Sequence, residues 1–454
     1  MNTYNKIGHW SWKYATVKFL ARSAFYIFYR KIYISGTENI PEGGGIIFGA
    51  NHQNALMDAL AVIFTNRYQP VYLARADIFR NPVMARILRF LKIMPVYRFR
   101  DGIEGMGRNE DTFDMTSAVL AGGGCIGIMP EGNHGEQKRL RVLKKGIFRI
   151  AFRAEEVNEN KAGIKIVPVG LDYSNTRRIF GELAVNYGKP LEVSRYSAIY
   201  SQHPQKGINE MKEDLAGSLG SLMIDIKDEQ NYSRDKLMLD IGSSVLQRRH
   251  NLSSMVPVNV FFACRILCQC LYQYFEQNPG YAEKLRSKSG RLDELIETYG
   301  ILPQSLDKPG KFEILISLLR NILCFPVFIT GFMLHIIPLG IIHVVLKKLK
   351  DPQFISSFKF VLGMLLIPLN YVFLAVLFFL HFSPVIALVV LALTPLAGIA
   401  AYRCLRFSRS FRNKMEFIRL CRLDSEIGKL ISDLRSEIIS ELEPVFQIAE
   451  EKLK

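Results

Sequence analysis

Hydrophobic and polar positions follow two different patterns along the chain. Before residue 200, short apolar runs bounded by turn residues predict buried strands, and the stretches between them have helical spacing. We expect strands at residues 46–50, 71–75, 93–98, 126–129 and 164–170. We expect helices at residues 53–64, 81–91 and 111–120, and another that opens at residue 144. Strands that alternate with helices predict an α/β fold with a mainly parallel sheet flanked by helices.

Long apolar stretches dominate the end of the chain. Residues 360–380 and 383–402 carry no formal charge, and each is long enough to cross about 30 Å of hydrocarbon. They predict a transmembrane hairpin over residues 360–402, and Lys and Arg residues on both flanks place both of its ends in the cytoplasm. Residues 312–346 contain Pro and Gly and predict a kinked or re-entrant membrane segment. The alternative to membrane insertion is a buried pair of soluble helices.

The other segments complete the predicted organisation. Residues 1–35 mix aromatic and basic side chains and predict an amphipathic segment at a membrane interface, unless they form a helix packed on the domain. The α/β domain is expected at residues 36–200, and a helical region without recognisable chemistry at residues 201–311. Residues 403–454 predict a basic stretch followed by an amphipathic helix.

Composition favours a membrane over nucleic acid as the partner of this chain. It has 58 Lys and Arg against 42 Asp and Glu, a net charge of +16, and 49% hydrophobic residues. A basic chain suits nucleic acid, an anionic membrane or phosphorylated substrates, but no RNA-binding signature is present and the apolar stretches point to lipid. The seven Cys lack metal-ligand spacing, so we expect buried thiols in a reducing compartment and no metal site.

The junction between the first strand and the first helix carries the first candidate chemistry. His52 follows the strand and Asp58 lies six residues later. Two side chains at i and i+6 of one helix do not share a face, so the pair can meet only if His52 precedes the helix proper. A carboxylate on one imidazole nitrogen would then make the other nitrogen a general base. Alternatively, His52 merely caps the helix and Asp58 is a solvated helix residue.

Two further polar groups follow other predicted strands. Arg98 ends the strand at residues 93–98, and Glu131 and Gly132 follow the strand at residues 126–129. Each is a weak signal alone, because Arg98 could be a surface base and Pro-Glu-Gly is common in turns. The carboxyl ends of parallel strands lie on one edge of a sheet. These two features and the His52–Asp58 pair can therefore form one pocket.

These motifs give residues of about 36–190 a resemblance to a known family. Asn51-His52 with Asp58, Pro95-Val96-Tyr97-Arg98, Met129-Pro130-Glu131-Gly132 and Val167-Pro168-Val169 resemble the four motifs of the glycerolipid acyltransferases, which include 1-acylglycerol-3-phosphate acyltransferases. The chain has five residues between the His and the Asp where the family usually has four. It continues with Asn133-His134 where Thr-Arg-Ser is common. Both departures are similar to the fungal glycerol-3-phosphate/dihydroxyacetone-phosphate acyltransferase branch.

The resemblance implies a membrane-bound O-acyltransferase of phospholipid biosynthesis with a catalytic domain that faces the cytoplasm. His52 and Asp58 would be catalytic, and the substrate-binding residues would include Arg98 for the acceptor phosphate. Glu131 would bind a glycerol hydroxyl or hold a base, and backbone N–H groups of residues 130–133 are candidates for stabilising an oxyanion. The other candidate substrate-binding residues are Gly132, Asn133, His134, Lys144 and Lys145.

The implied substrates are an acyl thioester and a phosphorylated glycerolipid. Acyl-CoA or acyl carrier protein would be the co-substrate, with no resident cofactor. The acceptor would be glycerol-3-phosphate or 1-acylglycerol-3-phosphate, and anionic membrane lipids would be further partners. Alternatives are an acyltransferase on another lysolipid, such as a lyso-aminolipid, or a non-catalytic lipid-binding membrane protein with the same fold. A transporter is disfavoured because the apolar segments lack paired acids and bases.

Overall fold

The chain forms two compact units. A computed structural model describes residues 7–96, 103–157, 163–253, 257–306 and 310–453. Unit 1 comprises residues 1–225 together with residues 350–360, and unit 2 comprises residues 226–349 and 361–454. Unit 1 therefore includes a short piece of chain that follows most of unit 2 in sequence.

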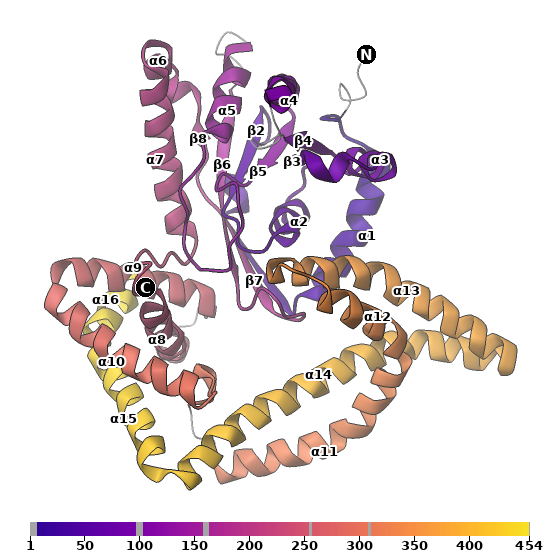
Figure 1. Cartoon of the computed structure of the whole chain (residues 1–454), viewed down its shortest axis with the longest axis vertical. Coiled ribbons are helices and arrows are strands. Elements are labelled where there is room, and N and C mark those ends of the chain that lie inside the picture. The colour runs from indigo at the N-terminus through magenta and orange to yellow at the C-terminus, as the bar shows by residue number, and fades with distance from the viewer. Residues whose placement is uncertain (1–6, 97–102, 158–162, 254–256, 307–309, 454) are drawn as a thin grey trace. The chain divides into compact units, whose positions relative to one another are not determined.

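Unit 1 is built on one mainly parallel sheet of the order β1-β7-β6-β2-β5-β3-β4, with β8 paired to β6 (Figure 1). From β6 to β4 all neighbouring strands are parallel, whereas β7 and β8 run antiparallel to β6. The described strands are β1 Lys31–Ser35, β2 Ile46–Ala50, β3 Val71–Arg75, β4 Ile93–Val96, β5 Cys125–Ile128, β6 Lys165–Tyr173, β7 Glu182–Tyr187 and β8 Leu191–Glu192. This confirms the predicted α/β class with a mainly parallel sheet.

Helices cover both faces of the sheet. On one face α4, α5 and α7 pack on the sheet, and on the other face α2 packs on β2, β6 and β7, with α1 beside α2 (Figure 1). The α-helices of unit 1 are α1 Trp12–Phe28, α2 Leu56–Thr65, α3 Pro82–Phe90, α4 Ile103–Ala121, α5 Gly146–Val157, α6 Ser194–Gln202 and α7 Pro204–Leu222. Short 3-10 turns lie at η1 Thr37–Asn39 and η2 Ala76–Phe79.

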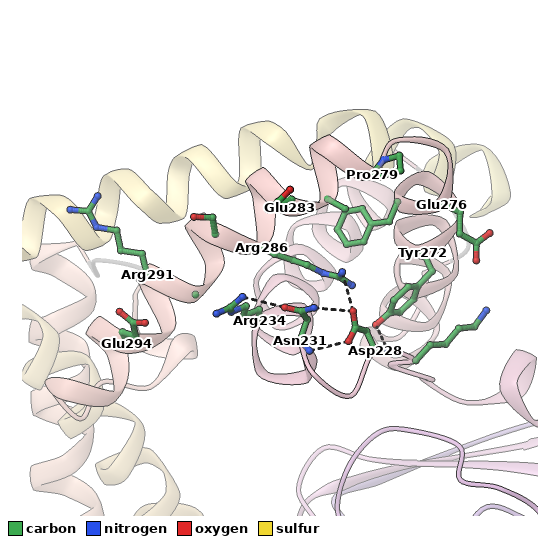
Figure 2. Close-up of a pocket in the computed structure, with 15 residues that line it drawn as sticks. Asp228, Asn231, Arg234, Tyr272, Glu276, Pro279, Glu283, Arg286, Arg291 and Glu294 are labelled. Carbon is green, nitrogen blue, oxygen red and sulfur yellow. Dashed lines mark hydrogen bonds and ion pairs between the residues drawn. The ribbon is translucent and has the colours of Figure 1, made fainter.

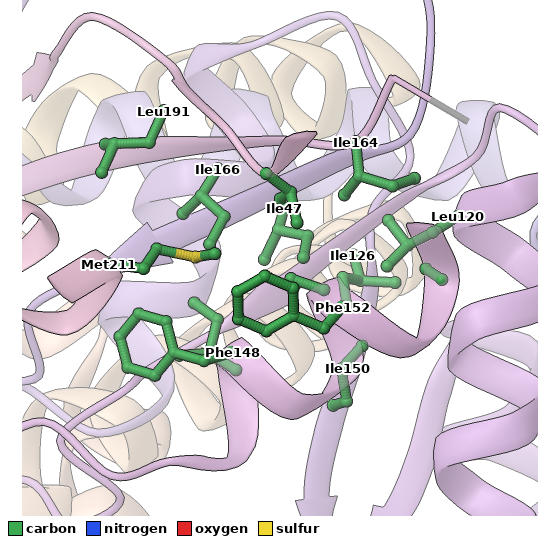
Figure 3. Close-up of a cluster of buried hydrophobic side chains, with 14 of the residues drawn as sticks. Ile47, Leu120, Ile126, Phe148, Ile150, Phe152, Ile164, Ile166, Leu191 and Met211 are labelled. Atoms are coloured by element: carbon green, nitrogen blue, oxygen red, sulfur yellow. The ribbon is translucent and has the colours of Figure 1, made fainter. Parts of the chain in front are cut away.

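The core on the α4, α5 and α7 face explains why the central strands read as continuous apolar runs. Figure 3 shows the side chains of Ile47, Ile126 and Ile166, one from each central strand, packed against Phe148 and Phe152 of α5. All five are essentially inaccessible to solvent. Strands that are buried on both faces need apolar residues at successive positions, so the short apolar runs located them well.

The predicted strands all occur, and the differences lie at the sheet edges. The expected strand at residues 93–98 ends at Val96 in the described residues. Strands β1, β7 and β8 were not predicted. Edge and antiparallel strands of this kind bury only part of their residues, and β1 has no fully buried residue. Helix α2, which was expected to begin at residue 53, begins at Leu56.

Unit 1 extends beyond the predicted boundaries of residues 36 and 200. At the N-terminus, β1 pairs with β7, and α1 buries Tyr14, Phe25 and Phe28 while it exposes Trp12 and Phe19. After residue 200, α7 buries Met211, Leu215 and Leu219 in the core. The apolar spacing of α7 therefore belongs to the sheet's cover and not to a separate helical region.

Unit 2 is entirely helical in the residues described. Its first helices are α8 Tyr232–Ser253, α9 Val260–Gln277 and α10 Pro279–Thr298, and its last are α15 Ser425–Glu441 and α16 Glu443–Leu453. Between them lie α11 Lys311–Leu334, α12 Ile336–Lys347, α13 Ile355–His381 and α14 Pro384–Leu423, with the short η4 Pro303–Ser305 before them. The η5 turn Pro352–Phe354 and the first residues of α13 belong to unit 1.

Among the residues that the structure describes, three helical segments are long and apolar enough to cross a membrane. They are residues 312–334, 352–381 and 384–423. The expected re-entrant segment is divided at His335 into α11 and the short α12. The predicted break between the two spans of the hairpin lies at Phe382 and Ser383, where α13 has ended and α14 has not begun. Helix α14 continues through the basic stretch after Tyr402.

Candidate active site

The carboxyl end of β2 brings His52 and Asp58 together. All five residues of β2 are buried, and the chain then turns through residues 51–55 before α2 begins at Leu56. Because His52 precedes the helix, its imidazole can turn back to the first helical turn. His52 Nδ1 lies 2.8 Å from Asp58 Oδ2.

The surroundings of Asp58 fix how the pair shares its protons. Asp58 is fully buried, so it is not the solvated helix residue of the alternative interpretation. Its Oδ2 also accepts a hydrogen bond from the Asn54 backbone N–H at 2.7 Å, and its Oδ1 accepts one from Tyr173 Oη at 2.7 Å. Because both oxygens of Asp58 act as acceptors, His52 donates from Nδ1 to Oδ2, and Nε2 carries the lone pair of the neutral ring.

The turn between His52 and α2 contains an unusual backbone conformation. Ala55, the residue before α2, has a φ of 45° and a ψ of −124°, a region that residues other than Gly rarely adopt. Such conformations cost on the order of 1–3 kcal/mol and persist where the surrounding structure requires them. Here the turn allows Asp58 to accept from both Asn54 and His52 in the first turn of α2.

The Asn of the Asn-His motif is part of the sheet. Asn51 Nδ2 donates to the Leu171 carbonyl at 3.0 Å, and the Leu171 N–H donates to Asn51 Oδ1 at 2.7 Å. This side chain continues the β2–β6 ladder by one residue after the strand ends. It therefore holds the backbone immediately before His52 against the neighbouring strand.

Glu131 and Arg141 clamp the backbone of His52. Strand β5 lies beside β2, with Gly49 opposite Ile128, so the turn after β5 reaches the same sheet edge. Glu131 Oε1 accepts the His52 backbone N–H at 3.3 Å, and Arg141 Nη2 donates to the His52 carbonyl at 2.6 Å. Arg141 Nε also donates to Glu131 Oε2 at 2.6 Å. Gly135 N–H is a second donor to the His52 carbonyl at 3.1 Å.

This clamp favours one of the two roles predicted for Glu131. Its side chain is 1% exposed, so it holds a base, Arg141, and offers no open face to a glycerol hydroxyl. Burial raises the pKa of Glu131 above its usual range, while the Arg141 guanidinium and the His52 backbone N–H oppose that rise. The acid is thus an internal support of the loop that carries His52.

His134 lies beside His52 with a partner from a distant part of the chain. The two rings meet edge to face, with centroids 5.4 Å apart. His134 Nδ1 is hydrogen-bonded to Gln353 Oε1, and Phe354 packs edge-on against the His134 ring at 4.9 Å between centroids. Burial lowers the pKa of His134 below 6.5, and His52 lowers it further. His134 is therefore neutral at neutral pH.

The other predicted residues lie nearby or outside the described residues. Gly132 has a φ of 73° in the turn and its N–H donates to the Met129 carbonyl at 3.1 Å, so this amide is already bonded. Asn133 is exposed beside it. Lys144 is exposed and only its backbone N–H is tied to the turn, through the Pro130 carbonyl at 2.7 Å.

Of the last two predicted bases, one lies on the surface and the other falls outside the described residues. Lys145 Nζ donates to Gln205 Oε1 at 2.6 Å on the exposed surface of unit 1. Arg98, the predicted phosphate ligand, lies outside the described residues. Strand β4, whose last described residue is Val96, is parallel to β3.

Four side chains of the site were missed in the sequence: Arg141, Tyr173, Gln353 and Phe354. Tyr173 ends β6 directly after a recognised strand, so its place at the same sheet edge was a usable signal. Arg141 lies in an irregular stretch with several other bases, and nothing distinguishes it there. Gln353 follows His134 by 219 residues, and no local pattern connects them.

Unit 2 contains a separate cavity of about 930 Å³ between α8, α9 and α10 (Figure 2). Its central feature is an ion pair, since Arg286 donates to the buried Asp235 at 2.9 and 2.7 Å. Figure 2 shows Arg286 directed toward Asp228 within this cavity. None of the residues predicted for the site lines the cavity, and its acids and bases are equal in number.

A carboxylate hydrogen-bonded to an imidazole, on a loop that Glu131 and Arg141 hold at one sheet edge, is an arrangement that suits general acid–base chemistry. The comparisons with known proteins agree with this class. Residues 31–172 match the protein-family model Acyltransferase, and they form an acyltransferase-family domain.

Curated relatives share part of the chain. Glycerol-3-phosphate O-acyltransferase 2 of Saccharomyces cerevisiae is 23% identical over 291 residues, which cover 59% of this chain and 38% of the relative. The 1-acyl-sn-glycerol-3-phosphate acyltransferase of Borreliella burgdorferi is 32% identical over 145 residues, which cover 32% of this chain and 52% of the relative. The chain thus spans about half or less of the length of these relatives.

A solved structure gives a third comparison. It is the 1-acyl-sn-glycerophosphate (LPA) acyltransferase PlsC from Thermotoga maritima, with 19% identity and a TM-score of 0.30. The match covers 44% of this chain and 79% of that chain.

Proposed function

We propose that this chain is a membrane-bound acyltransferase that moves a fatty acyl group from a thioester to a hydroxyl of a glycerol phosphate acceptor. The acceptor is glycerol-3-phosphate or 1-acylglycerol-3-phosphate, and the donor is acyl-CoA or acyl carrier protein. The observation that carries this proposal is the His52–Asp58 pair, with Nδ1 and Oδ2 2.8 Å apart, inside the segment that matches the acyltransferase model. The names of both curated relatives support the acceptor class.

The pair accounts for the proton of the acceptor hydroxyl. The hydroxyl oxygen attacks the thioester carbonyl, and its proton passes to His52 Nε2. Asp58 stabilises the cationic imidazole that results, which is the role of the acid in a Ser-His-Asp triad. The new ester C–O bond forms as the C–S bond breaks, and His52 returns its proton to the leaving thiolate. A thiolate leaves readily because the pKa of a thiol is about 8.5.

Arg98 is proposed to bind the acceptor phosphate, because a planar guanidinium suits phosphate oxygens. Its replacement by Ala should raise the KM for the acceptor and leave the KM for the thioester nearly unchanged. Kinetics with each substrate varied in turn check this expectation. A selective rise in the thioester KM would move Arg98 to the donor pocket.

The proposed activity can be tested directly. The purified full-length protein in lipid nanodiscs receives labelled acyl-CoA together with glycerol-3-phosphate or with lysophosphatidate, and the labelled lipid products are separated. We expect acylation of at least one acceptor, and near-complete loss of it in His52→Ala. Absence of acylation with both acceptors, or equal acylation by His52→Ala, would contradict the proposal.

The catalytic unit is proposed to face the cytoplasm, where acyl-CoA is present. Residues 350–360 pack within unit 1, so the chain must return to the side of unit 1 after α12. No candidate span is found between unit 1 and α11 in the part of the chain that the structure describes. These observations support the re-entrant path expected for α11 and α12, which enter the bilayer and return. Helices α13 and α14 would then form the transmembrane hairpin.

Cysteine labelling of a Cys-free variant tests this topology. Introduced cysteines at Ser201 and Lys350 should react only with reagents that reach the cytoplasm. A cysteine at Phe382, in the turn between α13 and α14, should react only from the opposite side. Labelling of Ser201 and Lys350 from opposite sides would exclude the re-entrant path.

A further inference from the structure

The segment that precedes the long apolar helix α13 forms part of the site beside His52. It carries Gln353 and Phe354, which contact the Nδ1 atom and the ring of His134. It lies outside the residues that match the acyltransferase model. The catalytic domain therefore takes one wall of its site from a part of the chain that the family match does not include.

This segment and the first turns of α13 that follow it are fixed to unit 1 independently of His134. Ser356 Oγ donates to the Thr176 carbonyl, and Lys359 Nζ donates to the Arg177 carbonyl at 2.7 Å. Phe360 packs edge-on against two aromatic rings of α1, Phe25 and Phe28, at 5.9 and 5.7 Å between centroids. Asp351 caps the η5 turn by accepting the Gln353 backbone N–H at 2.9 Å. The position of Gln353 is thus set by contacts that do not involve the His134 imidazole.

The Gln353 contact determines which nitrogen of His134 is an acceptor. An amide oxygen only accepts hydrogen bonds, so His134 Nδ1 must carry the proton. The ring is neutral at neutral pH, since burial and His52 lower its pKa. Its Nε2 therefore carries a lone pair. The edge-on contact with Phe354 restricts rotation of the ring.

Two imidazoles with acceptor nitrogens thus lie side by side, with ring centroids 5.4 Å apart. Only His52 is backed by a carboxylate that would stabilise its cation, so only His52 is suited to take a proton. A neutral imidazole backed by an amide is suited to accept a hydrogen bond and keep the donor protonated. An acceptor substrate with two neighbouring hydroxyls could contact both imidazoles: the reacting hydroxyl would give its proton to His52, and the other would donate a hydrogen bond to His134.

We propose that His134, positioned by Gln353 and Phe354, selects acceptors with two adjacent hydroxyls by accepting a hydrogen bond from the hydroxyl that does not react. This inference rests on the proposed function and deepens it, because glycerol-3-phosphate has two adjacent hydroxyls whereas lysophosphatidate has one. A partly buried acceptor left without its donor disfavours the substrate that lacks the second hydroxyl. Glycerol-3-phosphate is therefore the preferred acceptor.

The test compares glycerol-3-phosphate with 3-hydroxypropyl phosphate, which lacks the middle hydroxyl. The full-length protein in nanodiscs receives acyl-CoA, and kcat/KM is measured for both acceptors. We expect the wild type to favour the diol roughly tenfold, as one hydrogen bond of the usual strength allows. His134→Ala should reduce this ratio to about one, and His134→Gln, whose amide oxygen accepts, should keep part of it.

A second variant tests the positioning role of Gln353. Gln353→Met keeps the volume of the side chain and removes the acceptor, so it should lower the diol ratio toward that of His134→Ala. The matched control is Gln202→Met, an exposed position at the end of α6, which should keep the wild-type ratio. The double variant His134→Ala with Gln353→Met should be no worse than His134→Ala alone, because the two residues act through one contact.

Three outcomes would overturn this inference. The first is a wild-type ratio near one, and the second is a ratio that survives in both His134→Ala and Gln353→Met. The third is acylation of lysophosphatidate but not of glycerol-3-phosphate, which would leave the proposed acyltransferase function intact. Failure of the proposed function itself is distinct, since the wild type would then acylate none of the three acceptors.

Discussion

Two imidazoles meet in this site, and each has its Nδ1 atom against a different kind of oxygen. His52 contacts a carboxylate, Asp58, which is fully buried and accepts two further hydrogen bonds. His134 contacts an amide, Gln353, and is packed by an aromatic ring. A carboxylate favours a protonated imidazole and an amide does not. The proposed base His52 and the proposed hydrogen-bond acceptor His134 are therefore the same kind of side chain in two different surroundings.

The two pairs also differ in how the chain brings them together. His52 and Asp58 are six residues apart and meet because a strand ends and a helix begins between them. His134 and Gln353 are 219 residues apart and meet only after the segment before α13 has packed on unit 1. The first pair can form with unit 1's own strand and helix, whereas the second requires the chain to return from unit 2.

The largest expected effect comes from replacing the carboxylate that contacts His52 by an amide, the group that contacts His134. Asp58→Asn keeps the size of the side chain but replaces the carboxylate by an amide, which stabilises a cationic His52 much less. General base catalysis contributes roughly 10²–10⁴-fold, so kcat should fall by about that factor. His52→Ala should lose a similar factor, and steady-state acylation assays measure both.

Tyr173→Phe is the matched control for Asp58→Asn. It removes one of the hydrogen bonds to Asp58, at 2.7 Å, and leaves the negative charge in place. We expect a loss of about tenfold in kcat, smaller than in Asp58→Asn, because a hydrogen bond to a charged group is worth roughly 1.5–3 kcal/mol and only the part that His52 feels enters turnover. Equal losses in Tyr173→Phe and Asp58→Asn would mean that the hydrogen-bond geometry, not the charge, is what His52 needs.

The clamp of Glu131 and Arg141 supports both imidazoles, because it holds the backbone of His52 from the loop that carries His134. Arg141→Gln would leave Glu131, which is 1% exposed, without its cation. Removing one partner of a buried ion pair is strongly destabilising. We expect a loss on the order of 2–3 kcal/mol, less than for a fully buried pair because Arg141 is itself 32% exposed. Thermal unfolding in detergent should show a lower midpoint for this variant.

Glu131→Gln sharpens the role of the clamp. Its amide oxygen can still accept the His52 N–H, and the Arg141 charge left behind is partly solvated, so we expect a smaller loss of stability than in Arg141→Gln. Turnover should nevertheless fall severely, because Arg141 loses the carboxylate that holds it against the His52 carbonyl. The double variant should be more stable than Arg141→Gln alone, since no buried carboxyl remains. A near-normal rate for Glu131→Gln would reduce the clamp to a support for folding.

The comparison also explains what the sequence could and could not predict. The central strands were found because each is a short apolar run, and β2 shows why: all five of its residues are buried. The His52–Asp58 pair followed from the strand-to-helix junction alone. The edge strand β1 was missed because none of its residues is fully buried. Gln353 and Arg141 were missed because their roles come from tertiary packing, which leaves no periodic signal.

The smallest expected effect comes from the reverse exchange, in which the second pair receives the chemistry of the first. Gln353→Glu places a carboxylate on His134 Nδ1 and should raise the pKa of His134, which burial now holds below 6.5. His52 and Arg141 already disfavour the cation at this position, while Asp58 and Asp351 favour it. The new carboxylate would favour the cation, as Asp58 and Asp351 do. His134 should therefore be protonated at pH 6 and could no longer accept a hydrogen bond at Nε2.

The sign of the resulting pH dependence follows from the direction of that shift. In Gln353→Glu the preference for glycerol-3-phosphate over 3-hydroxypropyl phosphate should be lost at pH 6 and should return as the pH rises through the new pKa. In the wild type, where the pKa of His134 is lowered, the preference should be lost only at a lower pH than in Gln353→Glu. Ratios of kcat/KM at several pH values cancel the protonation of His52, because both acceptors use the same base. A ratio in Gln353→Glu that is independent of pH would show that the carboxylate does not control the charge of His134, and the contrast between the two imidazoles would then rest on His52 alone.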